Sequence, residues 1–302
     1  MKKIILSLFA AGTLLTAHAK LNVVATTADF AAIAREIGGD KIELTTLAKP
    51  TEDPHFVDAK PSFIVKLNHA DVLIEGGAEL EIGWLPALLD QSRNEKLAAG
   101  APGHVACVQG IRLLDVPSTL DRSKGDIHAA GNPHYTTDPV NAKIIALNIA
   151  NALCALDEKS CDTYRANLKR FTEALDTKLI EWQKTLEPFK GQEVVAYHDS
   201  WPYFGERFGL KIDLFLEPKP GIPPTPAHLA DVIVKMKQDN VHVIIVDPYL
   251  NRKTAETVAR NTGATVVDVT QFPGGVKGTE GGYIPMMDYL VNSMAKALGE
   301  KK

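Results

Sequence analysis

The fold is decided by residues 160–186, which read SCDTYRANLKRFTEALDTKLIEWQKTL and lie just past the middle of the chain. Apolar side chains recur there every three or four residues, a spacing that places them on one face of a helix. They are Tyr164, Leu168, Phe171, Leu175, Leu179, Trp182 and Leu186. At 1.5 Å per residue this helix would be ~40 Å long, enough to span two lobes. We therefore predict a spine that joins two lobes, in preference to a helix packed on one surface.

Short runs rich in Val and Ile alternate with segments of helical periodicity on both sides of this helix. Strands are predicted at residues 21–27, 42–47, 72–75 and 105–109 before it, and at 194–197, 212–216, 243–246 and 265–269 after it. Strands of this kind with helices between them favour parallel βαβ units. The predicted fold is α/β, with two lobes of parallel-type sheets flanked by helices and joined by the spine helix. The predicted boundaries are 1–19 for a signal peptide, 20–156 and 191–302 for the lobes, and 157–190 for the linking helix.

The composition excludes several classes of protein. A length of 302 residues fits about two domains of ~150 residues each. With 45% hydrophobic and 23% charged residues, the chain can build packed cores, so it is not a disordered or collagen-like protein. The formal net charge is −4 and no basic block occurs, which argues against nucleic-acid binding. We expect a monomer whose partners are small ligands or other proteins.

The N-terminus indicates export. Met1, Lys2 and Lys3 form a positive segment, an apolar stretch follows, and residues 17–19 read AHA, which matches a signal-peptidase site. The apolar stretch is shorter than the ~20 residues of a membrane-spanning helix. No cysteine follows the cleavage point, so a lipid anchor on a new N-terminal cysteine is not expected. The sequence therefore predicts a periplasmic protein that is released by signal cleavage and is not lipid-anchored.

Three cysteines are compatible with an oxidising compartment. Cys154 and Cys161 flank a short polar segment that predicts a turn between two helices, and a disulfide between them is one of two open outcomes. Cys107 lies in an apolar run and is expected to be a buried thiol. No C-x-x-C spacing occurs, so the cysteines do not predict a metal cluster.

Three histidines share a pattern that favours metal binding. His198 directly follows a predicted strand, His55 follows another in the other lobe, and His134 ends the long loop of residues 117–139. Ligands of open α/β folds bind at the carboxyl ends of the strands, so these rings are placed to converge between the lobes. Three imidazoles suit Zn²⁺ or a similar borderline cation. Each histidine taken alone is more often a solvated loop residue, and no compact motif such as H-E-x-x-H supports the prediction.

The chain resembles the cluster A-I solute-binding proteins of metal-uptake ABC transporters, of the zinc type. The matching pieces run in the family's order over nearly the whole chain after the signal peptide: Asp53-Pro54-His55, residues 67–74, Asn132-Pro133-His134, residues 197–204 and residues 283–287. The resemblance implies two α/β lobes with the metal buried between them. It also implies delivery to an inner-membrane permease with a cytoplasmic ATPase, and leaves open whether a periplasmic protein loads the metal.

The family's first three ligands carry over to His55, His134 and His198. A histidine at the third position resembles the zinc members, whereas manganese members tend to have a carboxylate there, in agreement with ligand chemistry. At the fourth position, where the family usually has Asp, the count back from Tyr283 places a residue of another type. The fourth ligand therefore stays open among Gln271, Asp247, Asp268, His128 and water.

The leading hypothesis is a periplasmic protein that captures Zn²⁺ and delivers it to an ABC permease, and that is not an enzyme. A manganese binder of the same family is one alternative. The other is a zinc hydrolase, because three histidines with an open fourth position can activate water. Asp199, Glu217 and Asp247 are the only carboxylates that the sequence suggests as its catalytic base.

Overall fold

The computed structural model describes residues 19–119, 125 and 128–300. Its described part contains two four-stranded sheets, and every pairing in them is parallel. The first sheet has the order β2-β1-β3-β4 and consists of β1 (Leu21–Ala25), β2 (Ile42–Thr46), β3 (Val72–Glu75) and β4 (His104–Ala106). The second has the order β6-β5-β7-β8 and consists of β5 (Glu193–Ala196), β6 (Lys211–Phe215), β7 (Val243–Val246) and β8 (Thr265–Asp268). The prediction of two α/β lobes with parallel sheets is confirmed.

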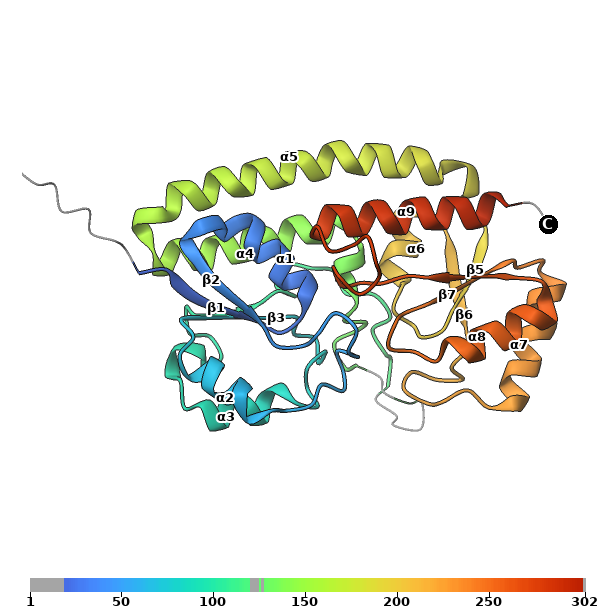
Figure 1. Ribbon diagram of the computed structural model, residues 1–302, viewed down its shortest axis with the longest axis horizontal. Helices are drawn as coiled ribbons and strands as arrows, with labels where there is room; N and C mark the ends of the chain where they lie inside the picture. The colour runs from blue at the N-terminus through green and yellow to red at the C-terminus, as the bar shows by residue number, and fades with distance from the viewer. Residues whose placement is uncertain (1–18, 120–124, 126–127, 301–302) are drawn as a thin grey trace, which may run out of the picture.

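Helices cover both faces of each sheet (Figure 1). Their bounds are α1 (Ala28–Gly38), α2 (Pro61–Asn68), α3 (Leu85–Ser92), α4 (Pro139–Leu156), α6 (Pro202–Phe208), α7 (Pro226–Gln238), α8 (Arg252–Thr262) and α9 (Tyr283–Gly299). In the first lobe α1 and α4 share one core, and α2 and α3 bury a second core on the other face. In the second lobe α6 and α9 lie on the face of the shared core, while α7 and α8 enclose a third core. Burial of both faces explains why the strands are runs of Val and Ile.

The long helix α5 (Cys161–Leu186) runs along both lobes, as predicted (Figure 1). Its buried side chains include Tyr164, Phe171, Leu175 and Trp182, which follow the predicted apolar face. The Trp182 indole donates a hydrogen bond of 2.8 Å to Asp288 of α9. One hydrophobic core contains residues of α5 and of both lobes, so the lobes are packed together along this helix.

The boundaries of some elements differ from the prediction for local reasons. The first strand ends at Ala25 and not at residue 27, because Thr27 is the N-cap of α1 and its backbone leaves the sheet. Helix α4 begins after Asp138, whose side chain accepts a hydrogen bond of 2.9 Å from the Val140 N–H. This is the usual capping arrangement, with Pro139 at the first helical position.

Helix α4 has 18 residues and a mean hydropathy of 1.4, so by length and composition alone it could cross a membrane. Its Ala142, Ile145, Ala146 and Ile149 are fully buried against the first lobe and α5. The core of the protein therefore accounts for its apolar character.

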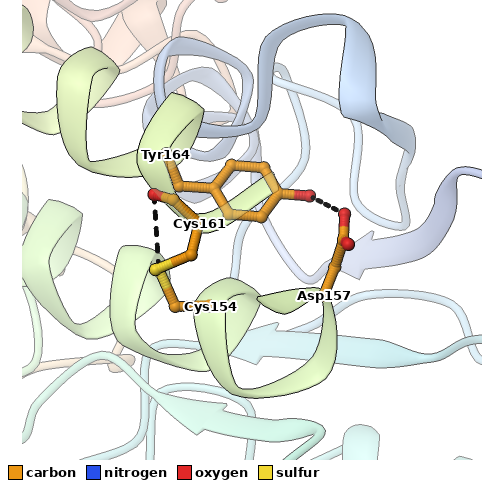
Figure 2. Close-up of a disulfide and its surroundings, with 4 residues drawn as sticks. All are labelled: Cys154, Asp157, Cys161 and Tyr164. Atoms are coloured by element: carbon orange, nitrogen blue, oxygen red, sulfur yellow. Dashed lines mark hydrogen bonds between the residues drawn. A yellow bond between two sulfur atoms is a disulfide. The ribbon is translucent and has the colours of Figure 1, made fainter. Parts of the chain in front are cut away.

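A disulfide joins Cys154 near the end of α4 to Cys161 at the start of α5 (Figure 2). The Cα atoms are 4.5 Å apart and the two residues are seven positions apart in sequence. Beside the bridge, the Tyr164 hydroxyl donates a hydrogen bond of 3.0 Å to Asp157 (Figure 2). The sequence left open whether Cys154 and Cys161 are bonded, and in the structure they form a disulfide. Cys107 is fully buried, as predicted.

The segment that leads into α4 connects the lobes through polar contacts. Arg207 of α6 donates two hydrogen bonds of 2.7 Å to the Asp138 carboxylate. The Tyr203 hydroxyl donates to the Asn132 carbonyl at 2.7 Å, and the Tyr283 hydroxyl donates to the Thr136 carbonyl at 2.7 Å. These bonds hold His134 in the interface between the two sheets.

Candidate metal centre

The three histidines predicted from the sequence converge between the lobes. His55 lies in the loop between β2 and α2, His134 directly precedes a short 3-10 turn before α4, and His198 is the second residue after β5. Their nearest ring nitrogens all lie within 4.8 Å of one another. The Nε2 atoms of His55 and His134 are 3.2 Å apart, and the ring centres of His134 and His198 are 5.5 Å apart. Ring nitrogens this close can contact one ion together.

Two of the histidines are presented by the same local device. In Asp53-Pro54-His55 the Asp53 side chain accepts a hydrogen bond of 3.0 Å from the His55 N–H. In Asn132-Pro133-His134 the Asn132 side chain accepts one of 3.0 Å from the His134 N–H. A side-chain oxygen that bonds the backbone two residues on, around a proline of restricted φ, defines a tight turn. Each ring is therefore held by its own tripeptide.

Each of the three rings also has a hydrogen-bond partner outside the cluster. His198 Nδ1 lies 2.7 Å from Glu217 Oε2, and His134 Nδ1 lies 3.1 Å from Gln271 Oε1. The His55 ring is hydrogen-bonded to the backbone of Leu80. A second partner of this kind fixes the tautomer and orientation of a ligating imidazole. For His134 and His198 it directs Nε2 toward the shared centre.

The electrostatics of the three rings differ. Burial, with the nearby rings of His128 and His198, lowers the pKa of His55 from 6.5 to about 3. Burial and the neighbouring rings also lower the pKa of His134 well below 6.5. Burial opposes protonation of His198 as well, but the hydrogen bond and charge of Glu217 outweigh it and raise its pKa. Two rings are thus neutral near pH 7, and only His198 retains a proton readily.

The open candidates for a fourth ligand lie in different places. Gln271 is 1% exposed and faces the Nδ1 side of His134, away from the centre. Asp268 ends β8 and forms an ion pair of 2.6 Å with Arg252. Asp247 is buried and accepts a hydrogen bond of 3.2 Å from the Trp201 indole. His128 stacks on His55, with ring centres 5.0 Å apart. None of these joins the three-histidine group among the described residues.

Glu217 is the residue whose role the sequence analysis missed, because it was considered only as a catalytic base. It is the second residue after β6, as His198 is the second residue after β5, and the two strands are neighbours in the sheet. Parallel neighbouring strands end at the same edge, so residues at equal positions beyond them lie close together. The equal spacing of His198 and Glu217 from the ends of their strands was the sequence signal that could have predicted this contact.

A cavity of about 120 Å³ lies beside the cluster. His134 and His198 line it together with His128 of the loop that precedes α4, and Asp199 and Pro220 contribute from the second lobe. Both lobes therefore form its walls. A ligand-sized space between two α/β lobes, at the carboxyl ends of their strands, defines a solute-binding protein that encloses a small ligand between its lobes.

Comparison with known proteins identifies the group more closely. The family model of the zinc-uptake complex component A, periplasmic (ZnuA), matches residues 23–297, so the chain belongs to this family. Its members are metal-binding, substrate-binding components of ABC transporters and are not enzymes. The chain is accordingly a metal ABC transporter substrate-binding protein. The hydrolase alternative is not supported by this membership.

The curated relatives differ in the metal that they are named for. A manganese ABC transporter substrate-binding lipoprotein, PsaA of Streptococcus anginosus, is 26% identical over 94% of this chain and 91% of its own length. An iron ABC transporter substrate-binding lipoprotein, MtsA of Streptococcus pyogenes serotype M1, is 26% identical over 96% of this chain and 92% of its own. The family membership is thus shown, and the choice of metal is not.

Solved structures share the fold. A crystal structure of ZnuA superposes with a TM-score of 0.79 at 22% identity, over 93% of this chain and all of that one. A manganese-bound periplasmic metal-binding protein from Candidatus Liberibacter asiaticus gives a TM-score of 0.75 at 22% identity, over 92% and 100%. The two-lobed arrangement with its long helix is therefore that of known metal-binding proteins.

The comparison corrects the expected mode of localisation. We expected a periplasmic protein without a lipid anchor, and the expectation of no lipid anchor is wrong, because the curated relatives are named lipoproteins. The expectation depended on the absence of a cysteine beside one expected cleavage site. That argument concerns only a lipid attached to a cysteine at that one position. Residues 1–18 lie outside the described part of the chain.

Proposed function

We propose that this protein captures Zn²⁺ with His55, His134 and His198 and delivers it to the permease of an ABC transporter. The observation that carries the proposal is the chemistry of the donor set. The three nearest donors are imidazole nitrogens, and no carboxylate among the described residues joins their group. Imidazole suits zinc, which takes four tetrahedral ligands, whereas Mn²⁺ favours carboxylate oxygens.

The protonation states support capture of a cation near neutral pH. A metal needs the unprotonated imidazole, and burial and neighbouring histidine rings lower the pKa of both His55 and His134. Glu217 places a negative charge behind His198, which compensates part of the charge of a bound dication. Residues 20–156 and 191–302 are proposed as the lobes that enclose the ion, with residues 157–190 as the linking helix.

A manganese or iron function is the second candidate, because the curated relatives are named for those metals. Asp199 lines the cavity beside His198 and is a carboxylate through which a harder cation could be held. Under that alternative His198 would be less important than the acidic side chains around it. The two candidates therefore differ in their dependence on His198.

The test is a competitive titration of the purified, metal-free protein with Zn²⁺, Mn²⁺ and Fe²⁺. We expect one zinc per chain, preferred over the other two metals, and loss of tight zinc binding in His198→Ala. His69→Ala is the matched control, because His69 is an exposed residue at the end of α2 and should not affect binding. Preference for Mn²⁺ or Fe²⁺ over zinc, or tight zinc binding in His198→Ala, would contradict the proposal.

A further inference from the structure

His128 lies next to the three-histidine cluster without being one of its members. Its ring stacks on His55 with centres 5.0 Å apart and an interplanar angle of 26°. The same residue lines the cavity of about 120 Å³ together with His134 and His198. The His128 imidazole thus contacts His55 and lines the same cavity as His134 and His198.

The backbone on the C-terminal side of His128 is anchored at this place. The Ala129 N–H donates a hydrogen bond of 2.7 Å to the Glu79 carboxylate. The Asn132 N–H donates to the Leu114 carbonyl at 2.8 Å, and the Gly131 N–H donates to the His128 carbonyl at 3.2 Å. Gly131 has a φ of +118°, and a Cβ there would lie 2.7 Å from the Leu114 oxygen. These constraints fix where the His128 side chain begins.

The turn that carries Glu79 is itself shaped for this contact. Gly77, Ala78 and Glu79 all have positive φ, at 71°, 50° and 66°. Two consecutive non-glycine residues in this region are uncommon and cost free energy. The turn directly follows β3, and it places the Glu79 carboxylate against the loop that bears His128.

The other side chains considered as fourth ligand lie in different surroundings. Gln271 accepts its hydrogen bond on the far side of the His134 ring, and Asp268 pairs with Arg252. Asp247 accepts from the Trp201 indole with Oδ2, its buried Oδ1 has no hydrogen-bond partner among the described residues, and it is not among the residues that line the cavity. Asp199 shares the cavity with His128, and neither side chain belongs to the group of donors within 4.8 Å of one another. Of these candidates, His128 lines the cavity and also stacks its imidazole ring on a member of the cluster, His55.

We propose that His128 is the fourth ligand of the captured ion. On binding, its ring turns from the stack on His55 and directs a nitrogen into the cavity, which gives four imidazole donors. Glu79 is the positioning residue that holds the His128 backbone. This inference rests on the proposed metal capture at the other three histidines. A shell of four protein ligands leaves no position for a reactive water, which suits a carrier and not a hydrolase.

The test uses the full-length, metal-free protein with two probes, Zn²⁺ in competition with a chelator and Co²⁺ for its visible absorption. His128→Ala should weaken zinc binding by ~100-fold or more. Loss of a ligand should cost at least as much affinity as loss of a residue that only hydrogen-bonds a ligand, which costs up to ~100-fold. Its cobalt spectrum should change, because water replaces an imidazole. Glu79→Gln should weaken zinc binding by only about tenfold and keep the cobalt spectrum, because the ligands are unchanged. His69→Ala is the control, expected to match wild type in both.

The outcomes separate this inference from the proposed function. If His198→Ala loses zinc but His128→Ala keeps wild-type affinity and spectrum, the fourth-ligand proposal is overturned and the three-histidine site remains. The fourth-ligand proposal is equally overturned if Asp199→Asn alone changes the cobalt spectrum, since the fourth donor is then a carboxylate. If His198→Ala itself retains tight binding, the capture site is wrong. Far-ultraviolet circular dichroism of each metal-free variant checks that the fold is intact.

Discussion

Glu217→Gln is the substitution that tests most directly how the second lobe tunes the site. Glu217 Oε2 lies 2.7 Å from His198 Nδ1 and also accepts a hydrogen bond of 3.1 Å from the Gly221 N–H. The carboxylate side chain is 11% exposed, so water replaces it poorly. Glutamine keeps the size and removes the charge. The substitution therefore removes the negative charge beside His198 and weakens the hydrogen bond that orients its ring.

The expected loss follows from the role of such outer partners. Removing one weakens metal binding by about 10- to 100-fold, which is ~1.4–2.7 kcal/mol. The sign of the pH dependence is also defined. Glu217 raises the pKa of His198, so in wild type a proton competes with the metal as the pH falls through that raised value. In the variant burial still lowers the pKa of His198 and only the charges of Asp53 and Asp199 raise it, so competition begins at lower pH.

The affinity gap between wild type and Glu217→Gln should therefore be widest at alkaline pH and narrow as the pH falls. The assay is zinc competition against a chelator at several pH values between ~5 and ~8, the range in which histidine charge changes. Glu256→Gln is the matched control, because Glu256 is an exposed helix residue of the same lobe that pairs with Arg252. Equal affinities at alkaline pH, or a gap independent of pH, would refute the reasoning.

Three further predictions concern stability of the metal-free protein. Replacing Cys154 and Cys161 by serine should lower the free energy of unfolding by about 2 kcal/mol, because their separation of seven residues closes only a small loop; denaturant titration checks this, and zinc affinity should not change. Leu175→Ala should cost ~2–5 kcal/mol, since this α5 side chain is 1% exposed in the core shared by both lobes; separate unfolding of the lobes in wild type would contradict that shared core. Burial, with the charge of Glu75, raises the pKa of Glu81 from 4.5 to about 7. Because the folded state then holds a proton that the unfolded state has lost, Glu81 should reduce stability as the pH rises from 4.5 to about 7, by ~3 kcal/mol in total. Glu81→Gln should show a correspondingly smaller decline in thermal unfolding across that range.

Much of the fold could be predicted because its signals are local. The runs that form β3 and β7 are apolar along their whole length, as strands buried on both faces must be. The face of α5 repeats every three or four residues over its whole length. The end of the first strand was misplaced by two residues, because Thr27 is equally suited to a strand and to a helix N-cap, and the tertiary structure selects the cap.

The site was predicted in part. Asp53-Pro54-His55 and Asn132-Pro133-His134 could be singled out because each turn is encoded within three residues. The partners of the rings could not be deduced in the same way. Gln271 lies 137 residues from His134 in sequence, and its carbonyl oxygen faces the ring nitrogen directed away from the cluster. The position of Gln271 in the sequence agreed with that of a metal ligand. Its orientation instead makes it the hydrogen-bond partner that orients His134.

By itself the sequence determined the alternation of strands and helices, the spine helix and the three histidines at or near strand ends, because each depends on neighbouring residues and on the periodicity of the chain. The tertiary structure alone decided that Gln271 of the second lobe faces the Nδ1 atom of His134, and that His128 adjoins His55. The physical reason is that a hydrogen bond forms only when the donor–acceptor distance is correct to within a fraction of an ångström. Between segments of two different lobes, such distances are set only when both sheets have packed against α5.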